Sequence, residues 1–172
     1  MIEMPILEEK TKDEFLDTIL ELYALNPEEQ PIKTIRDIWM PEITQENPEY
    51  VKSIYQFAGT ISRVGEDDQI RRAIDSLVLG YKILKEQTIK NGKQIPVIDR
   101  ETFHKVNSEF PFDELNLEKI ILTISCENPV YWDYLKSTLT IYVEDEFVKE
   151  NTYGFAAFCY TLLKEQAVKN SE

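Results

Sequence analysis

Histidine is almost absent from this sequence, and its scarcity excludes most sites that depend on an imidazole base. His104 is the single histidine of the 172 residues, and no Gly-x-Ser-x-Gly turn is present to expose a nucleophilic serine. Glu101 and His104 have the spacing that places a carboxylate and an imidazole on one helix face, but a di-metal site of that kind needs two such pairs. We therefore expect no enzyme activity, no catalytic residues and no metal site.

Glycine and long apolar runs are also scarce. The five glycines are scattered and form neither of the glycine-rich loops that bind nucleotide phosphates, so we expect no cofactor. No stretch approaches the roughly 20 apolar residues of a membrane span, and the N-terminus lacks the basic start and apolar run of a signal peptide. The expected protein is soluble and cytoplasmic, without membrane contact, and Cys126 and Cys159 are expected to be reduced thiols.

Positive charge is in short supply as well. Lysine and arginine number 19 against 32 acidic residues, and the formal net charge of −13 argues against direct binding to the phosphates of nucleic acid. The imbalance is uneven, because residues 1–50 and 101–172 are acidic whereas segment 63–93 is rich in lysine and arginine. That basic segment can face the acidic parts of the same fold or an acidic partner, and the sequence does not choose between them.

Apolar residues recur at helical spacing along most of the chain. Residues 11–23 combine a capping box with an apolar stripe, and residues 67–92 carry a longer stripe that ends at a glycine stop signal. A last helix is expected over 152–168. We predict an all-α fold, with 1–172 forming a single helical domain built as a bundle or short helical array of about six to eight helices.

Three segments do not fit this pattern cleanly. Trp39-Met40-Pro41 is expected to break a helix, because proline lacks the backbone N–H that an interior turn needs. Residues 120–124 and 138–143 are rich in β-branched residues, and the second run nearly alternates in polarity. The alternative fold is therefore α+β, with a small hairpin formed by 118–125 and 137–144.

Glu-Asn-Pro-x-Tyr occurs twice, at residues 46–50 and 127–131, which is a spacing of 81 residues. Asparagine followed by proline is a strong helix start, since the side chain can accept from a free backbone N–H and proline is preset for the first turn. Asn116 is expected to cap a further helix between them. The match does not continue at this spacing, so the preferred interpretation is a reused N-cap rather than a duplication.

Candidate binding residues come from two local concentrations of side chains. The first is the densest aromatic cluster, whose members cannot all lie on one buried stripe and whose type supplies contact area at interfaces. The second is an acidic run, whose consecutive helix positions point in different directions and cannot converge on one cation. The predicted partner-binding residues are Tyr131, Trp132 and Tyr134 from the first group and Glu144, Asp145 and Glu146 from the second.

High negative charge on a helical scaffold with surplus aromatic residues favours protein–protein interaction over catalysis. The leading hypothesis is an acidic helical protein-binding module, such as an inhibitor, immunity-type protein or nucleic-acid mimic, that acts on a basic protein partner. One alternative is a small-ligand-binding protein or enzyme with a pocket of carboxylates and tyrosines between helices. Another is a subunit of a structural homo-oligomer, and the sequence does not rank oligomeric states.

Overall fold

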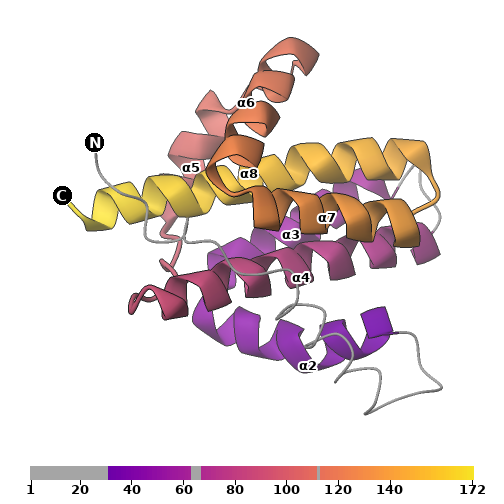
Figure 1. Cartoon of the computed structure of the whole chain (residues 1–172), viewed down its shortest axis with the longest axis horizontal. Coiled ribbons are helices and arrows are strands. Elements are labelled where there is room, and N and C mark those ends of the chain that lie inside the picture. Colours follow the sequence, from indigo (N-terminus) through magenta and orange to yellow (C-terminus); the bar gives the residue numbers. More distant parts are fainter. Residues whose placement is uncertain (1–30, 63–66, 112) are drawn as a thin grey trace.

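The computed structural model describes residues 31–62, 67–111 and 113–172, with residues 31–38 described by their backbone alone. These residues form helices and no strand, which confirms the predicted all-α class (Figure 1). The helix expected over 11–23 lies outside the described residues. In chain order, with the labels of Figure 1, the seven described helices are α2 (Pro31–Glu46), α3 (Pro48–Ile61), α4 (Asp67–Lys90), α5 (Arg100–Glu109), α6 (Glu114–Glu127), α7 (Pro129–Tyr142) and α8 (Glu146–Asn170).

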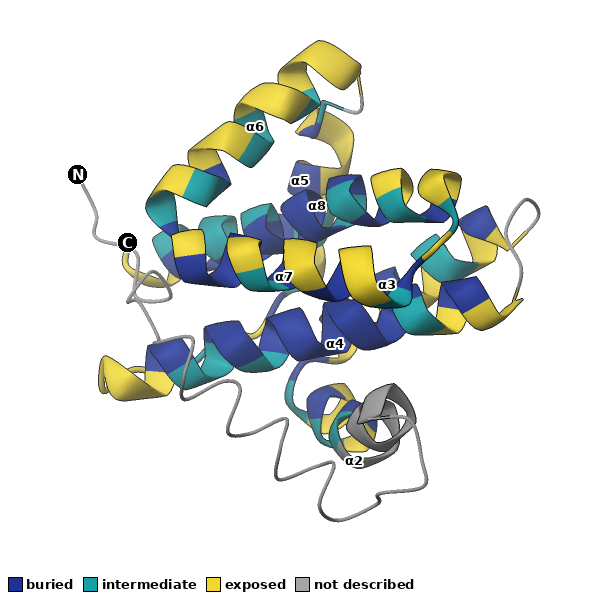
Figure 2. Ribbon diagram, turned by 45° about the vertical axis from the view of Figure 1, so that its right-hand side comes forward, coloured by how far each residue is buried: buried dark blue, intermediate teal, exposed yellow. Residues whose placement is uncertain are grey.

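α4 lies at the centre of the molecule and matches the helix predicted over 67–92. α2 packs along one side of α4, and α7 and α8 pack along the other (Figure 2). By the colours of Figure 1, α4 and α8 run in the same direction, and α6 projects away from the body. Ile124 is the one fully buried residue of α6, so this helix is held mainly at its C-terminal end.

Tyrosine rings occupy the centre of the core. Tyr50, Tyr81, Tyr131 and Tyr160 are each at most 2% exposed. The ring centroids of Tyr50 and Tyr81 lie 4.8 Å apart, and those of Tyr131 and Tyr160 lie 5.6 Å apart. Burial raises the pKa of all four phenols, that of Tyr81 to about 12, because an ionised phenolate would lose its hydration. The neutral rings therefore serve here as large apolar side chains.

The alternative with a β-hairpin is wrong. Residues 118–125 lie inside α6, and residues 137–142 lie inside α7, so both β-branched runs are helical. α7 buries Leu135, Thr138 and Leu139, which is helical spacing rather than the alternation of a strand. The packing of this stripe outweighs the preference of β-branched residues for sheets, which depends strongly on context.

Trp39-Met40-Pro41 does not break the helix as expected. α2 continues from Pro31 to Glu46 with Pro41 inside it. Met40 and Ile43 are 6% and 0% exposed, whereas Pro41 lies on the exposed side. Because burial of this apolar stripe stabilises the continuous helix, the chain tolerates the one backbone hydrogen bond that proline removes.

Two helices begin earlier than predicted because aspartates cap them. α6 begins after Asp113, whose carboxylate accepts from the backbone N–H of Asn116 at 3.1 Å, so Asn116 is the donor and not the cap. α8 begins after Asp145, which accepts from the N–H of Val148 at 3.1 Å, six residues before the predicted start at 152. Carboxylates at a helix N-terminus also interact favourably with the helix dipole.

The Glu-Asn-Pro-x-Tyr pattern belongs to a longer internal repeat. At a spacing of 79 residues, 81–91 and 160–170 share Tyr-x-x-Leu-Lys-Glu-Gln-x-x-Lys-Asn. The spacing changes from 81 to 79 because 62–66 separate α3 from α4, whereas 143–145 separate α7 from α8. The chain therefore contains two copies of one three-helix unit, α2–α3–α4 and α6–α7–α8, which corrects the interpretation as a reused N-cap.

Contacts within each unit repeat with the residues. Lys85 on α4 forms an ion pair with Glu46 at the end of α2, and Lys164 on α8 forms one with Glu127 at the end of α6, at 2.6 Å. The two asparagines that follow these glutamates share one backbone conformation, with φ of −146° at Asn47 and −141° at Asn128. The same side chains therefore fasten the short helix to the long helix in both copies.

Contacts between the units repeat in a reciprocal way. Gly80 of α4 and Cys159 of α8 occupy equivalent positions at the spacing of 79 residues. A Cβ at Gly80 would lie 3.1 Å from the Tyr131 ring, and the Tyr50 hydroxyl donates to the Cys159 thiol. Each unit thus places its conserved-pattern tyrosine on the same point of the other unit's long helix. This reciprocity is the arrangement expected of two related units that pack face to face.

Candidate functional site

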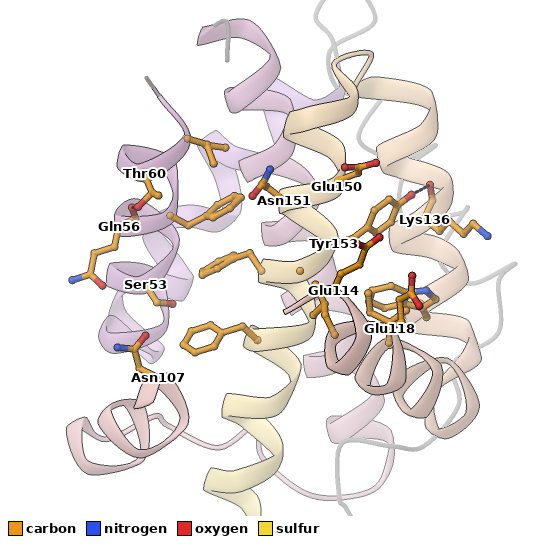
Figure 3. A pocket seen from close by; sticks show the side chains of 18 of the residues that line it. Ser53, Gln56, Thr60, Asn107, Glu114, Glu118, Lys136, Glu150, Asn151 and Tyr153 are labelled. Carbon is orange, nitrogen blue, oxygen red and sulfur yellow. Dashed lines mark hydrogen bonds between the residues drawn. The ribbon is translucent and has the colours of Figure 1, made fainter. Parts of the chain in front are cut away.

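A groove of about 980 Å³ lies between α6 and the body of the molecule (Figure 3). α6 forms one wall, and α3, α5, α7 and α8 supply the rest of the lining. Most of its polar lining side chains, among them Gln56 and Asn107, are exposed, so the groove is open to solvent. Its volume is at the upper end of the roughly 300–1,000 Å³ typical of ligand sites.

Aromatic side chains form the floor of this groove. Phe57 of α3 stacks on Phe155 of α8, with ring centroids 4.4 Å apart and planes 8° from parallel. Phe155 and Phe103 both contact Phe158, at centroid distances of 5.6 and 6.1 Å. These packed rings offer a rigid apolar surface with few rotatable bonds to order on binding. The aromatic residues of the lining are Phe57, Phe103, Trp132, Tyr153, Phe155 and Phe158.

The rim of the groove is acidic on one side. Glu114 and Glu118 of α6 and Glu150 of α8 line it there, with Lys136 of α7 as the one basic residue of the lining that the structure describes. In Figure 3 the Lys136 side chain extends away from the groove, whereas the opposite rim carries neutral hydroxyl and amide groups. A cationic group that enters is therefore attracted toward one edge of an apolar floor.

Glycine lets α6 approach α8 closely at the base of the groove. A Cβ on Gly154 would lie 3.2 Å from a methyl carbon of Leu117, which is tighter than an ordinary contact. One turn of chemistry away, the Tyr153 hydroxyl donates to the carbonyl of Lys136 at 3.4 Å and connects α8 to α7. These contacts position the wall that carries Glu114 and Glu118 over the aromatic floor.

The predicted aromatic candidates separate in the structure. Tyr131 is 2% exposed and belongs to the core, where it stacks on Tyr160. Trp132 lines the groove and meets Tyr153 at a centroid distance of 5.8 Å. Tyr134 is half-buried and is not part of the lining. Of the three, Trp132 is the one that the fold brings to the candidate site.

The predicted acidic candidates lie at the turn between α7 and α8, outside the groove lining. Asp145 caps α8, and Glu146 forms an ion pair with Lys149 at 3.1 Å. The backbone N–H groups of Glu144 and Asp145 both donate to the side-chain oxygen of Gln69, at 2.7 and 3.1 Å. Asp145 therefore has a structural role, while the exposed carboxylates of Glu144 and Glu146 stay predicted partner-binding groups.

Part of the basic segment 63–93 faces the acidic α2. Lys82 and Lys85 form ion pairs with Glu42 at 3.4 and 2.6 Å. The hydrogen bond from Lys85 holds the pKa of the Glu42 carboxyl below its ordinary value. Arg72 pairs with Asp68 at 3.2 Å within α4. These groups are therefore engaged inside the fold rather than gathered on one free basic face.

The residues that could have supported metal chemistry do not converge. Glu101 and His104 are both exposed, and Glu101 pairs with Lys169 at 3.1 Å. Across 31–62, 67–111 and 113–172, no group of three or more histidine, cysteine or acidic side chains could hold a metal ion. In the same part of the chain, no helix combines the length and the apolar character needed to cross a bilayer.

The two cysteines are expected to differ sharply in reactivity. Cys126 is exposed, whereas Cys159 is fully buried, and burial raises the pKa of its thiol to about 12. With Ellman's reagent at pH 8, we expect one thiol to react within minutes in the folded protein and the second to react after unfolding in urea. Cys126→Ser is the control and should abolish the fast phase; two fast thiols would contradict the burial of Cys159.

Sequence reasoning missed most of the groove. Phe57 and Phe155 are separated by almost 100 positions in the chain, and neither stands in a dense aromatic cluster comparable to 131–134. The available signal was the run of aromatic residues at 153–160, which is richer than one buried stripe of a helix requires. No local pattern indicates that α3 supplies the stacking partner.

Comparison with known proteins adds no relative. No family model matches the chain, and neither the curated proteins nor the solved structures contain a detectable match. The function is therefore argued from the groove and the charge of the chain.

Proposed function

We propose that this protein is an acidic binding module that takes a basic, amphipathic helical segment of another protein into the groove between α6 and the body. The observation that carries the proposal is the combination of an aromatic floor with three glutamates on one rim. An amphipathic helix can place its apolar side chains on the floor and direct lysine or arginine toward Glu114, Glu118 and Glu150. The net charge of −13 would attract such a partner from a distance and speed association.

Among acidic binders, an inhibitor or immunity-type protein agrees better with this groove than a nucleic-acid mimic does. A mimic needs a regular band of acidic groups that reproduces a phosphate backbone. Here the acids of the rim are three in number and flank an apolar surface. An apolar groove with an acidic rim supports the capture of one segment of a protein partner.

A small ligand is the second candidate occupant. A volume of about 980 Å³ and a lining of packed aromatic rings also suit an apolar molecule that carries a cationic group. The tyrosine and carboxylate pocket expected for that alternative is represented by Tyr153, Glu114 and Glu118. Assembly as a structural homo-oligomer stays a prediction, and sedimentation of the free protein over a range of concentrations tests it.

The test uses two synthetic helical peptides of about 20 residues with the same Leu and Phe face, one with lysines and the other with glutamates on the polar face. We expect the lysine peptide to bind at least tenfold more tightly by fluorescence anisotropy, because it alone complements the rim. Raised salt should weaken this binding. Phe155→Ala should reduce the affinity at least tenfold, since it removes a stacked ring from the floor.

Matched variants separate the groove from the acidic turn. Glu114→Gln with Glu118→Gln should weaken the lysine peptide and flatten its salt dependence, whereas Glu144→Gln with Glu146→Gln leaves the groove intact and serves as control. Tyr55→Ala is the aromatic control, because Tyr55 is exposed on α3 and is not part of the lining. Equal binding of both peptides, or loss with the turn variant alone, would refute the proposed site.

A further inference from the structure

Two buried amides clamp the connector between α4 and α5. The Asn47 side chain accepts from the backbone N–H of Ile98 at 2.8 Å and donates to the carbonyl of Pro96 at 2.9 Å. The Gln166 side chain accepts from the N–H of Asp99 at 3.0 Å and donates to its carboxylate at 3.1 Å. Asn47 and Gln166 thus act together, from α2–α3 and α8, on one short stretch of extended backbone.

The internal repeat supplies a second copy of this clamp. Asn128 is the equivalent of Asn47, and Gln87 is the equivalent of Gln166. Both are at most 1% exposed. They bind each other, with Gln87 donating to Asn128 at 3.0 Å and Asn128 donating to Gln87 at 2.8 Å. The same amide groups that hold a backbone segment in the first clamp are therefore closed on one another in the second.

The chain also contains a second copy of the clamped segment. Residues 95–99 are Ile-Pro-Val-Ile-Asp, and residues 4–8 are Met-Pro-Ile-Leu-Glu, which is the same succession of apolar residue, proline, two apolar residues and acid. A threonine follows three positions after the acid in both, at Thr102 and Thr11. Each segment precedes its own copy of the three-helix unit in the chain. Residues 4–8 lie outside the described residues.

We propose that Asn128 and Gln87 form a second clamp whose occupant is residues 5–8 of the same chain. By equivalence, Asn128 would accept from the N–H of Leu7 and donate to the carbonyl of Pro5, and Gln87 would bind Glu8. The exchange is feasible because both amides trade one set of buried hydrogen bonds for another of the same number. A tethered segment is favoured over a separate peptide because its effective concentration is in the millimolar range.

Amide hydrogen exchange, measured by NMR on the full chain, tests this clamp. We expect the N–H groups of Leu7 and Glu8 to exchange at least tenfold more slowly than in an unstructured peptide of the same sequence. Asn128→Ala should remove this protection. Asn47→Ala is the matched control, because it removes the equivalent clamp and should expose Ile98 and Asp99 while it leaves Leu7 and Glu8 protected.

Leu7→Pro provides a second variant that removes the N–H donor without touching the buried amides. It should shift the side-chain amide resonances of Asn128 and leave those of Asn47 in place. Unprotected exchange at Leu7 and Glu8 in the unmodified protein, or unchanged Asn128 resonances in Leu7→Pro, would overturn the proposal. Protection that falls on dilution would also overturn it, because the segment would then come from a second copy of the chain.

Discussion

Tyr131→Ala is expected to lower the free energy of unfolding by about 3 to 5 kcal/mol, the range found when a large buried aromatic side chain is truncated. Tyr131 is 2% exposed, and its ring lies between the Tyr160 ring and the backbone at Gly80. Its removal leaves a cavity at the contact between the two three-helix units, where no neighbouring side chain can fill the space without disturbing another buried ring. Urea unfolding followed by circular dichroism measures the change.

The equivalent position offers an internal comparison for this result. Tyr50→Ala should have a similar effect, because Tyr50 is 1% exposed and packs against Tyr81 and Cys159 in the same way. Tyr134→Ala, at a half-buried site on α7, is the control and should lower stability by about 1 kcal/mol or less. A cost at Tyr131 no larger than that at Tyr134 would contradict its place in the core.

Alkaline pH is expected to unfold the protein with a large and steep effect. Burial raises the pKa of Tyr81 from 10.0 to about 12 and that of Cys159 from 9.0 to about 12, and it also raises the pKa of Tyr50, Tyr131 and Tyr160. A raised pKa means that the folded state binds the proton more tightly, so the stability is complete below the unfolded-state pKa. It is lost as pH rises toward the folded-state pKa, and Tyr81 alone accounts for about 2 to 3 kcal/mol.

Tyrosine absorbance at 295 nm and helicity at 222 nm, recorded together from pH 8 to about pH 12.5, test this expectation. Four of the nine tyrosines should ionise only as helicity is lost, well above the pH at which exposed phenols titrate. Urea unfolding at about pH 11 should show a lower free energy of unfolding than at pH 8. Simultaneous titration of all nine tyrosines near pH 10 with helicity retained would disprove the burial of the cluster.

The repeat shows why local sequence comparison was insufficient. Glu46-Asn47-Pro48 and its partner at 127–129 match at one spacing, and 81–91 matches 160–170 at another. The two-residue difference lies in the connections 62–66 and 143–145, and loops accept such changes at small energetic cost. A comparison that allowed for this gap would have found the repeat from sequence.

Asn47 illustrates the opposite case, in which the sequence pattern was sound and the role was different. Asparagine before proline predicted a side-chain N-cap, and α3 does begin there. The side chain makes no capping hydrogen bond and instead binds the connector at Pro96 and Ile98. At Asn128 the predicted cap is present, with the Tyr131 N–H donating at 3.2 Å. Identical local sequences thus differ because different backbone lies above them.

The candidate site was only partly accessible to sequence reasoning. Trp132 was predicted as a binding residue and lines the groove, whereas Tyr131 beside it is in the core. Adjacent positions on a helix point about 100° apart, so a dense aromatic cluster divides between core and surface in a way that depends on the neighbouring helices. Phe57 and Phe155 meet because α3 packs beside α8, which no short-range pattern encodes.

The sequence by itself determined the helical class, the absence of the common catalytic and phosphate-binding motifs, the acidic charge and the starts of α3, α4 and α7, because these depend on residue type and on spacings within a few turns. The tertiary structure alone decided that α2 runs through Pro41, that 120–124 and 138–143 are helical, and that an aromatic groove opens beneath α6. These outcomes depend on burial against residues far away in the chain, and burial outweighs local propensities of a few tenths of a kcal/mol per residue.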